Sequence, residues 1–284
     1  MPMSKTARAA RAEIPPLPEP LPVPVTDAHT HLDMQDTTVA EALEKAAAAG
    51  VTRVVQVGCD VERAHWAVRT AAEHEAVWAA VALHPNEAPR LERDGGPAAL
   101  DAALDEIAAL AAHDEVRAVG ETGLDYFRTG PEGIAAQHRS FRRHIAIAKE
   151  TGKTLMIHDR DAHADVLRLL EEDGAPERTV FHCFSGDAAM ARHCAERGYY
   201  LSFAGNVTFA GAQPLRDALA AAPPELLLVE TDAPFLTPVP WRGRPNAPYL
   251  IPHTLRAMAE VKGLDEDTLA RHLAANTLRA FGAG

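Results

Sequence analysis

The sequence has little cysteine and no long apolar run. Its only cysteines are Cys59, Cys183 and Cys194, which are widely spaced and odd in number, so a disulfide framework is not expected. Thiols of this kind are typical of a reducing compartment, and we predict a cytoplasmic protein. No apolar run reaches the length of about 20 residues that crosses a bilayer, and no apolar stretch follows the basic N-terminal residues as in a secretory signal. We therefore expect no membrane association.

The sequence also has no tract of lysine and arginine, and its formal net charge is −12. Proteins that grip long duplexes usually present a basic face that releases counterions, so an extended duplex footprint is not expected. A nucleic acid held locally remains possible, because divalent cations would add positive charge at a site. The charge balance favours a short or single-stranded segment over a long duplex.

What is present is a regular alternation of short β-branched runs and segments of helical periodicity over a chain with a typical globular composition, 47% hydrophobic and 24% charged. The predicted strands are Leu21–Ala28, Arg53–Gly58, Val77–Leu83, Val116–Gly120, Thr154–Ile157, Thr179–Phe181, Tyr199–Phe203 and Leu226–Val229. Helical segments lie between these strands, and a further helical pair closes the chain. This order predicts an α/β fold, a single-domain (β/α)₈ TIM barrel over residues 25–284.

Two further features bear on this architecture. A doubly wound open sheet is the rival fold, but it would want a glycine-rich turn after the first strand, and none is present. Residues 1–24 form a proline-rich N-terminal extension, which we expect to be an extended, solvated lead-in to the barrel.

The most informative stretch is Asp-Ala-His-Thr-His at residues 27–31. Residues two apart in a strand face the same way, so the imidazoles of His29 and His31 should project together. Two converging neutral imidazoles suit a cation such as Zn²⁺. Asp27 is expected to orient one of them from behind.

Other strand ends carry polar side chains in the same register. The C-terminal ends of barrel strands open onto one face, where the active site lies. The residues found there are His29, His31, His84, Glu121, His158, His182, Asn206 and Asp232. The sequence therefore predicts that histidines and carboxylates from several strands converge on one metal-binding mouth.

The strings DAHTHLD, GETGLDY, IHDRDA, HCFSG and ETDAPFL, in this order, resemble the TatD family of metal-dependent hydrolases, part of the amidohydrolase-like barrels. The resemblance runs from about Val25 to Phe281. It implies a (β/α)₈ barrel with two or three divalent ions (Zn²⁺, Mg²⁺ or Mn²⁺) and hydrolysis of DNA phosphodiesters, often from the 3′ end. The implied partner is DNA, as single strands or 3′ ends, and no obligate protein partner is evident.

Site residues carried over from the resemblance fall into two groups. The implied metal ligands are His29, His31, Glu121, His158, His182 and Asp232. The implied substrate-contacting residues are His84, Arg160 and Asn206. The sequence departs from the family pattern at Thr122 and in the loop Arg244–Ala247, where an extra proline precedes Asn246, and both departures look conservative.

These residues predict a mechanism. Glu121 could bridge two cations through its two oxygens, with His29, His31 and Asp232 on one cation and His158 and His182 on the other. Cations about 3.5–4 Å apart clamp the attacking and leaving oxygens of an in-line displacement and acidify water. Asp232 is the expected general base. No Ser-His-Asp order is apparent, so covalent catalysis is not expected.

Two alternatives remain open. The same centre could hydrolyse a small ester or amide, or an aminoacyl ester at a tRNA end, because it would activate water against a carbonyl carbon equally well. The fold and the metals cannot separate these reactions from phosphodiester cleavage. A non-catalytic barrel with a structural metal is the other alternative, which the complete set of ligand positions disfavours.

Overall fold

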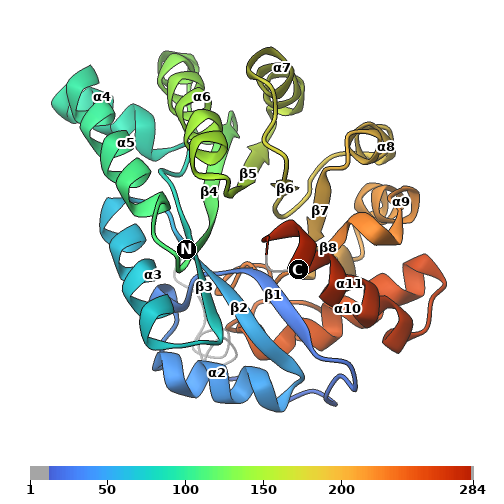
Figure 1. Ribbon diagram of the computed structural model, residues 1–284. Helices are drawn as coiled ribbons and strands as arrows, with labels where there is room; N and C mark the ends of the chain where they lie inside the picture. Colours follow the sequence, from blue (N-terminus) through green and yellow to red (C-terminus); the bar gives the residue numbers. More distant parts are fainter. Residues whose placement is uncertain (1–12, 283–284) are drawn as a thin grey trace, which may run out of the picture.

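A computed structural model describes residues 13–282, and the predicted (β/α)₈ barrel is confirmed (Figure 1). Its strands are β1 (Val25–Thr30), β2 (Val51–Gly58), β3 (Val77–Val81), β4 (Val116–Asp125), β5 (Thr154–Arg160), β6 (Thr179–Phe181), β7 (Tyr200–Phe203) and β8 (Leu227–Val229). All neighbouring strands are parallel and follow one another in sequence order. Within this part of the chain, no helix is long and apolar enough to cross a membrane.

Helices surround the strands on their outer side (Figure 1). They are α2 (Val39–Ala48), α3 (Val61–Glu73), α4 (Glu87–Gly95), α5 (Pro97–Ala111), α6 (Ile134–Thr151), α7 (His163–Asp173), α8 (Ala188–Glu196), α9 (Gln213–Ala221), α10 (Ile251–Lys262) and α11 (Glu266–Ala280). Short 3₁₀ turns include η1 (Leu32–Met34) after β1, η3 (Gly205–Thr208) after β7 and η5 (Pro248–Leu250) before α10. Helix α4 was not predicted, because its sequence is polar and buries only Ala88.

Apolar side chains fill the barrel interior on the side of the N-terminal ends of the strands. Val57, Ala80 and Met156 are fully buried members of this inner cluster. Phe281 at the end of α11 packs near Trp78 of β3, with ring centroids 6.0 Å apart. Because Trp78 lies near the start of its strand, this packing closes the N-terminal end of the barrel. The predicted metal ligands lie at the other end of the strands, at the mouth.

The barrel closes at the seam between β1 and β8. The backbone N–H of Asp232 donates to His29 O, and that of His31 donates to Ala233 O, each at 2.9 Å. Beneath these bonds the fully buried Asp27 accepts the backbone N–H of Thr231 at 2.9 Å and its hydroxyl, together with the backbone N–H of His29. Burial raises the pKa of Asp27 to about 8. The prediction that Asp27 orients an imidazole is therefore wrong, since its carboxylate joins the two backbones instead.

Strands β4 and β5 both run further than predicted. Their pairing continues to Asp125 opposite Arg160, although the stretch Gly120–Asp125 contains two glycines, which weaken isolated strands. Gly123 has φ +137°, and a Cβ placed there would lie 2.1 Å from the carbonyl oxygen of His158. Glycine is thus required for the close approach of the two strands. That approach brings the residues around Glu121 next to His158.

The proline-rich segment is packed along one side. Pro15, Pro18 and Leu21 are buried while the residues between them are exposed, and a spacing of three is the period of a polyproline II helix. The Tyr249 hydroxyl donates to Pro15 O at 2.6 Å, and the Leu21 N–H donates to Ala49 O at 3.1 Å. Within residues 13–24, the expected solvated lead-in is met only by the outward-facing residues, and residues 1–12 of the extension lie outside the described part of the chain.

His144 of α6 is a fully buried histidine outside the mouth, and it makes stability depend on pH. Its Nε2 accepts the backbone N–H of Leu83 at 3.1 Å, while its Nδ1–H donates to Ser140 O at 2.7 Å. Burial lowers its pKa from 6.5 to about 4. Because the unfolded chain takes up the proton first, the stabilisation is complete above pH 6.5 and is lost as the pH falls towards 4.

We predict that the stability advantage of the wild type over His144→Gln shrinks by up to about 3 kcal/mol across that window, since one pKa unit corresponds to about 1.4 kcal/mol. Urea unfolding of both proteins between pH 7 and pH 4 measures it. An advantage that stays constant with pH would contradict a neutral, buried His144.

Candidate metal centre

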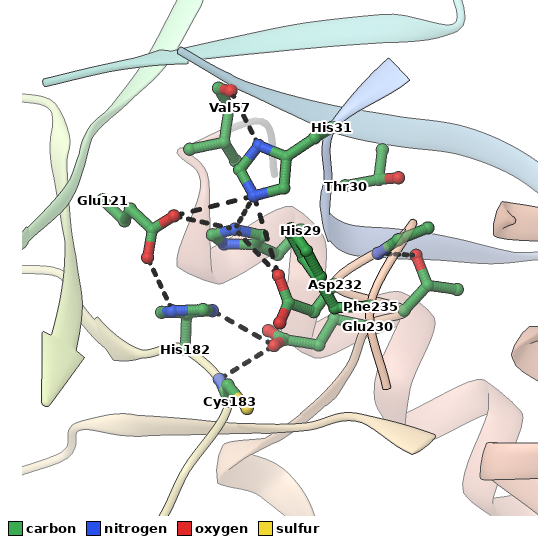
Figure 2. A network of polar contacts seen from close by, with 12 residues as sticks. His29, Thr30, His31, Val57, Glu121, His182, Cys183, Glu230, Asp232 and Phe235 are labelled. Atoms are coloured by element: carbon green, nitrogen blue, oxygen red, sulfur yellow. Dashed lines mark hydrogen bonds and ion pairs between the residues drawn. The ribbon is translucent and has the colours of Figure 1, made fainter. Parts of the chain in front are cut away.

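The side chains predicted as metal ligands meet at the C-terminal mouth of the barrel, and Figure 2 labels all of them except His158. His29 and His31 come from the end of β1, and their Nε2 atoms are 3.3 Å apart, as the alternation of the strand predicted. His182 follows β6, and its ring stacks on that of His29 with centroids 3.9 Å apart. His29, His31 and His182 are all buried. Strands distant in sequence therefore deliver imidazoles to one point.

Glu121 of β4 lies between two groups of imidazoles. Its Oε1 is 3.5 Å from His29 Nε2 and 3.6 Å from His31 Nε2. Its Oε2 is 2.9 Å from His182 Nε2 and 3.1 Å from His158 Nδ1. Each carboxylate oxygen thus faces a different pair of histidines, which is the arrangement a bridging ligand requires.

Asp232 lies beside His29 and His31, which form the first of the two histidine pairs. Its Oδ1 is 3.6 Å from His31 Nε2 and 3.8 Å from His29 Nε2, and its side chain is 15% exposed. The residue has φ +52°, a left-handed conformation in which aspartate is tolerated better than most residues. This backbone turn directly follows the seam hydrogen bond and directs the carboxylate to the mouth.

The ring nitrogens of His31, His182 and His158 that face away from Glu121 contact other polar groups of the protein. The Nδ1–H of His31 donates to Val57 O at 3.1 Å, which leaves Nε2 with a free lone pair facing the centre. His182 Nδ1 lies 3.2 Å from Oε1 of the fully buried Glu230. His158 Nε2 lies 3.3 Å from Asp125 Oδ2. Such contacts fix the tautomer and the orientation of metal-binding histidines.

Glu230, Asp125 and Cys59 are functional neighbours that the sequence reasoning did not assign. Glu230 and Asp125 stand inside the motifs ETDAPFL and GETGLDY, so a signal for them was present. Cys59 directly follows β2 and donates its S–H to Glu121 Oε1 at 3.3 Å. Burial, and then the nearby Glu121, raise the pKa of Cys59 well above its usual value, so it stays a thiol.

Cys183 lies next to the candidate centre, just beyond the end of a strand. Strand β6 ends at Phe181, and Cys183 has φ +41°, so the alternation of a strand no longer applies to it. The residue is partly exposed, and its sulfur lies 4.0 Å from Asn206 Nδ2. Its backbone N–H donates to Glu230 Oε1 at 2.8 Å.

The predicted substrate-contacting residues have different surroundings. His84 lies beside the centre, with Nε2 3.9 Å from Glu121 Oε2, and its ring meets His158 edge-on at 4.5 Å. The Arg160 guanidinium lies 3.9 Å from the ring centroid of Phe127. Asn206 is in η3, with its Oδ1 buried and unpartnered. Between residues 13 and 282, neither Arg160 nor Asn206 hydrogen-bonds to the six predicted ligands.

The electrostatics of the centre suit cations. Burial disfavours the charged form of Glu121, but His182, His158 and His29 outweigh it and hold its pKa well below the usual range. Burial, and then the nearby His182, lower the pKa of His29, which keeps its imidazole neutral. Groups able to hold a metal ion include His29 with His31 and Asp232, and His84 with Glu121 and His158. Burial lowers the pKa of His31, His158 and His182, but the nearby carboxylates outweigh it and raise the pKa of all three, so a cation would bind there in competition with protons. An ionised carboxylate among imidazoles suits divalent cations.

Comparisons with known proteins agree with this geometry. The family model for TatD related DNase matches residues 26–282. The chain is 48% identical over 268 residues to an uncharacterized metal-dependent hydrolase TatD of Mycobacterium tuberculosis, covering 92% of this chain and 98% of that protein. It is 35% identical over 249 residues to a protein of Citrobacter rodentium named 3′-5′ ssDNA/RNA exonuclease TatD, covering 85% and 91%.

A solved structure is also similar. The crystal structure of YJJV, a TatD homolog from Escherichia coli K12, superposes with a TM-score of 0.83 at 28% identity. The match covers 92% of this chain and 98% of that one. Both the sequence and the backbone are therefore similar over nearly the whole barrel.

The two-sided position of Glu121 generates a prediction about metal content. Glu121→Ala removes the oxygens shared by both histidine pairs, so it should lose both ions or keep one weakly, whereas His29→Ala should mainly weaken one. Elemental analysis of purified variants measures this, with the 89% exposed Glu177 changed to alanine as the control. Two full equivalents retained by Glu121→Ala would exclude Glu121 from the centre.

Proposed function

Because the chain belongs to the TatD family of metal-dependent hydrolases, we propose that it cleaves DNA phosphodiester bonds, as a 3′-to-5′ exonuclease on single-stranded or frayed ends. The observation that carries the proposal is Glu121, whose two oxygens face two separate pairs of histidines. The name of the Citrobacter rodentium relative supports the choice of nucleic acid as substrate.

The proposed centre holds two cations, or three, of Zn²⁺, Mg²⁺ or Mn²⁺. His29, His31 and Asp232 would hold one cation, His158 and His182 the other, and Glu121 would hold both. Paired divalent cations polarise the phosphodiester, stabilise the attacking and leaving oxygens and lower the pKa of water. The protein's part is to fix the donors, which the contacts behind His31 and His182 do.

Asp232 is proposed as the general base. Its Oδ1 lies with the first histidine pair, and its second oxygen is left to accept a proton from the attacking water. Burial raises the pKa of this carboxyl, but His31 and His29 outweigh it and lower the pKa below its usual value. The carboxylate is therefore ionised at neutral pH and able to accept the proton.

We propose that His84, Arg160 and Asn206 contact the substrate. Arg160 ends β5 and Asn206 follows β7 at the mouth, where a guanidinium and an amide can bind phosphate and base edges. With a net charge of −12 and no basic tract, we expect the substrate to be held at the mouth alone. Such a grip suits a strand end, and the three free cysteines support a reducing, cytoplasmic location.

A second candidate substrate is a small ester or amide, or an aminoacyl ester at a tRNA end. The acidic net charge of −12 favours the small ester or amide, since a small neutral substrate needs no basic surface. The same donors would serve both reactions. Substrate tests therefore have to include both classes.

We predict release of nucleotides from the 3′ end of single-stranded DNA and no cleavage of closed circular duplex. A screen should compare 3′-labelled single strands, closed duplex, aminoacyl-tRNA and simple esters, each with added Zn²⁺, Mg²⁺ or Mn²⁺ and with Glu121→Ala as the blank. Efficient nicking of the closed circle without preference for ends would contradict the proposed polarity. Hydrolysis confined to the carbonyl esters would replace the proposal with the second candidate.

A separate prediction distinguishes the base from the ligands. Asp232→Asn keeps an oxygen for the cation but cannot take up the proton, so it should retain most of the metal and lose about 10²- to 10⁴-fold in kcat. The loss should affect kcat more than KM. Metal content and kcat measured on one preparation test this. Near wild-type turnover with full metal would assign the base elsewhere, with His84 the next candidate.

A further inference from the structure

Exposed apolar side chains gather at the mouth. Outside the proline-rich segment, the large hydrophobic side chains exposed in the described part of the chain are Met34, Phe127, Phe235, Val239 and Leu278. All except Leu278 lie on loops that follow β1, β4 or β8, at the C-terminal end of the barrel. Single exposed apolar residues are common, but a gathering around a polar site marks a binding surface.

The two phenylalanines are the most exposed of these, at 62% for Phe127 and 49% for Phe235. Each is tied to the metal centre by its neighbours. Phe127 lies two residues after Asp125, which contacts His158. Phe235 donates its backbone N–H to Asp232 O, and its ring lies 6.3 Å from that of His31 (Figure 2). The Phe235 ring thus lies beside the first histidine pair, while Phe127 lies on the loop after β4, two residues beyond the Asp125 that contacts His158.

Arginine side chains lie near the loops that carry these two phenylalanines. The guanidinium of Arg160 lies 3.9 Å from the centroid of Phe127, and the side chain of Arg128 is exposed next to it. On the β8 side, Arg242 lies 4.3 Å from the centroid of Phe209 and lines a cavity of about 450 Å³ together with Pro234 and Leu236. Among the described residues, none of these three guanidinium groups has a carboxylate within 4.0 Å, so all are available to phosphates.

We propose that Phe127 and Phe235 are stacking platforms for the two unpaired nucleobases that flank the scissile phosphodiester, one on each side of the metal centre. This inference rests on the proposed function and names its substrate as nucleotides whose bases are unstacked. Aromatic side chains with nearby cations hold single strands in this way without sequence preference, because every base has a π face. Stacking would also offset the weak phosphate attraction of a protein with a net charge of −12.

Stacking with bases explains why two large apolar side chains remain exposed at the mouth. An exposed phenylalanine gives up the stabilisation that burial of its side chain would bring. Arg160 covers one side of the Phe127 ring, yet the residue remains 62% exposed, which leaves room for a planar group. A paired duplex end offers no free base faces at these positions. The platforms therefore select single-stranded or frayed ends.

The test compares oligonucleotides that carry or lack a base. Single strands with an abasic site at the last or at the penultimate 3′ nucleotide are compared with the intact strand, using kcat/KM for the first cleavage. Wild type should prefer the intact strand by about 5- to 100-fold for each base removed. Phe127→Leu should abolish the preference at one of the two positions and Phe235→Leu at the other, with metal content unchanged.

Matched variants isolate the aromatic ring. Phe127→Tyr should keep the wild-type preference, because a phenol still stacks. Leu278→Ala, on the outer face of α11, should leave all rates unchanged. If either leucine variant retains the full preference at both positions, the two-platform proposal is overturned. If wild type releases no nucleotide from any strand yet hydrolyses esters, the proposed function has failed instead.

Discussion

The structure depends on one shared carboxylate. Glu121 is 4% exposed and is surrounded by imidazoles that come from four strand ends. Its Oε1 faces His29 and His31, and its Oε2 faces His158 and His182. A buried carboxylate is costly unless charges or donors compensate it. The glycine at position 123 and the long β4–β5 pairing allow the approach that this compensation needs. The backbone of β4 and β5 therefore takes the path that places Glu121 among the histidines.

The seam of the barrel serves the same centre. Asp27 holds Thr231, and the backbones of His29 and Asp232 hydrogen-bond to each other across β1 and β8. His29 and Asp232 both supply ligand atoms on the side of the centre that also contains His31. The contacts that close the barrel therefore also position half of the candidate metal centre, and a weakened seam would disturb both.

Much of this was predictable from the sequence, because strand ends in a barrel converge whatever the loops do. The pair His29 and His31 shows this, since strand alternation alone brings their Nε2 atoms to 3.3 Å. Contacts between different strands were not predictable. Cys59 reaches Glu121 across the mouth, and Asp27 binds a backbone instead of a ring, because partners on other elements set these distances. The position of Cys183 could not be derived from strand alternation, because β6 ends at Phe181.

The most direct test of the bridging role is anomalous diffraction from crystals of the protein loaded with Mn²⁺ or Zn²⁺. We expect two peaks on opposite sides of the Glu121 carboxylate, one beside His29, His31 and Asp232 and the other beside His158 and His182. A single peak among His29, His182 and Glu230, a group that could also hold an ion, would contradict a shared carboxylate at the heart of the site.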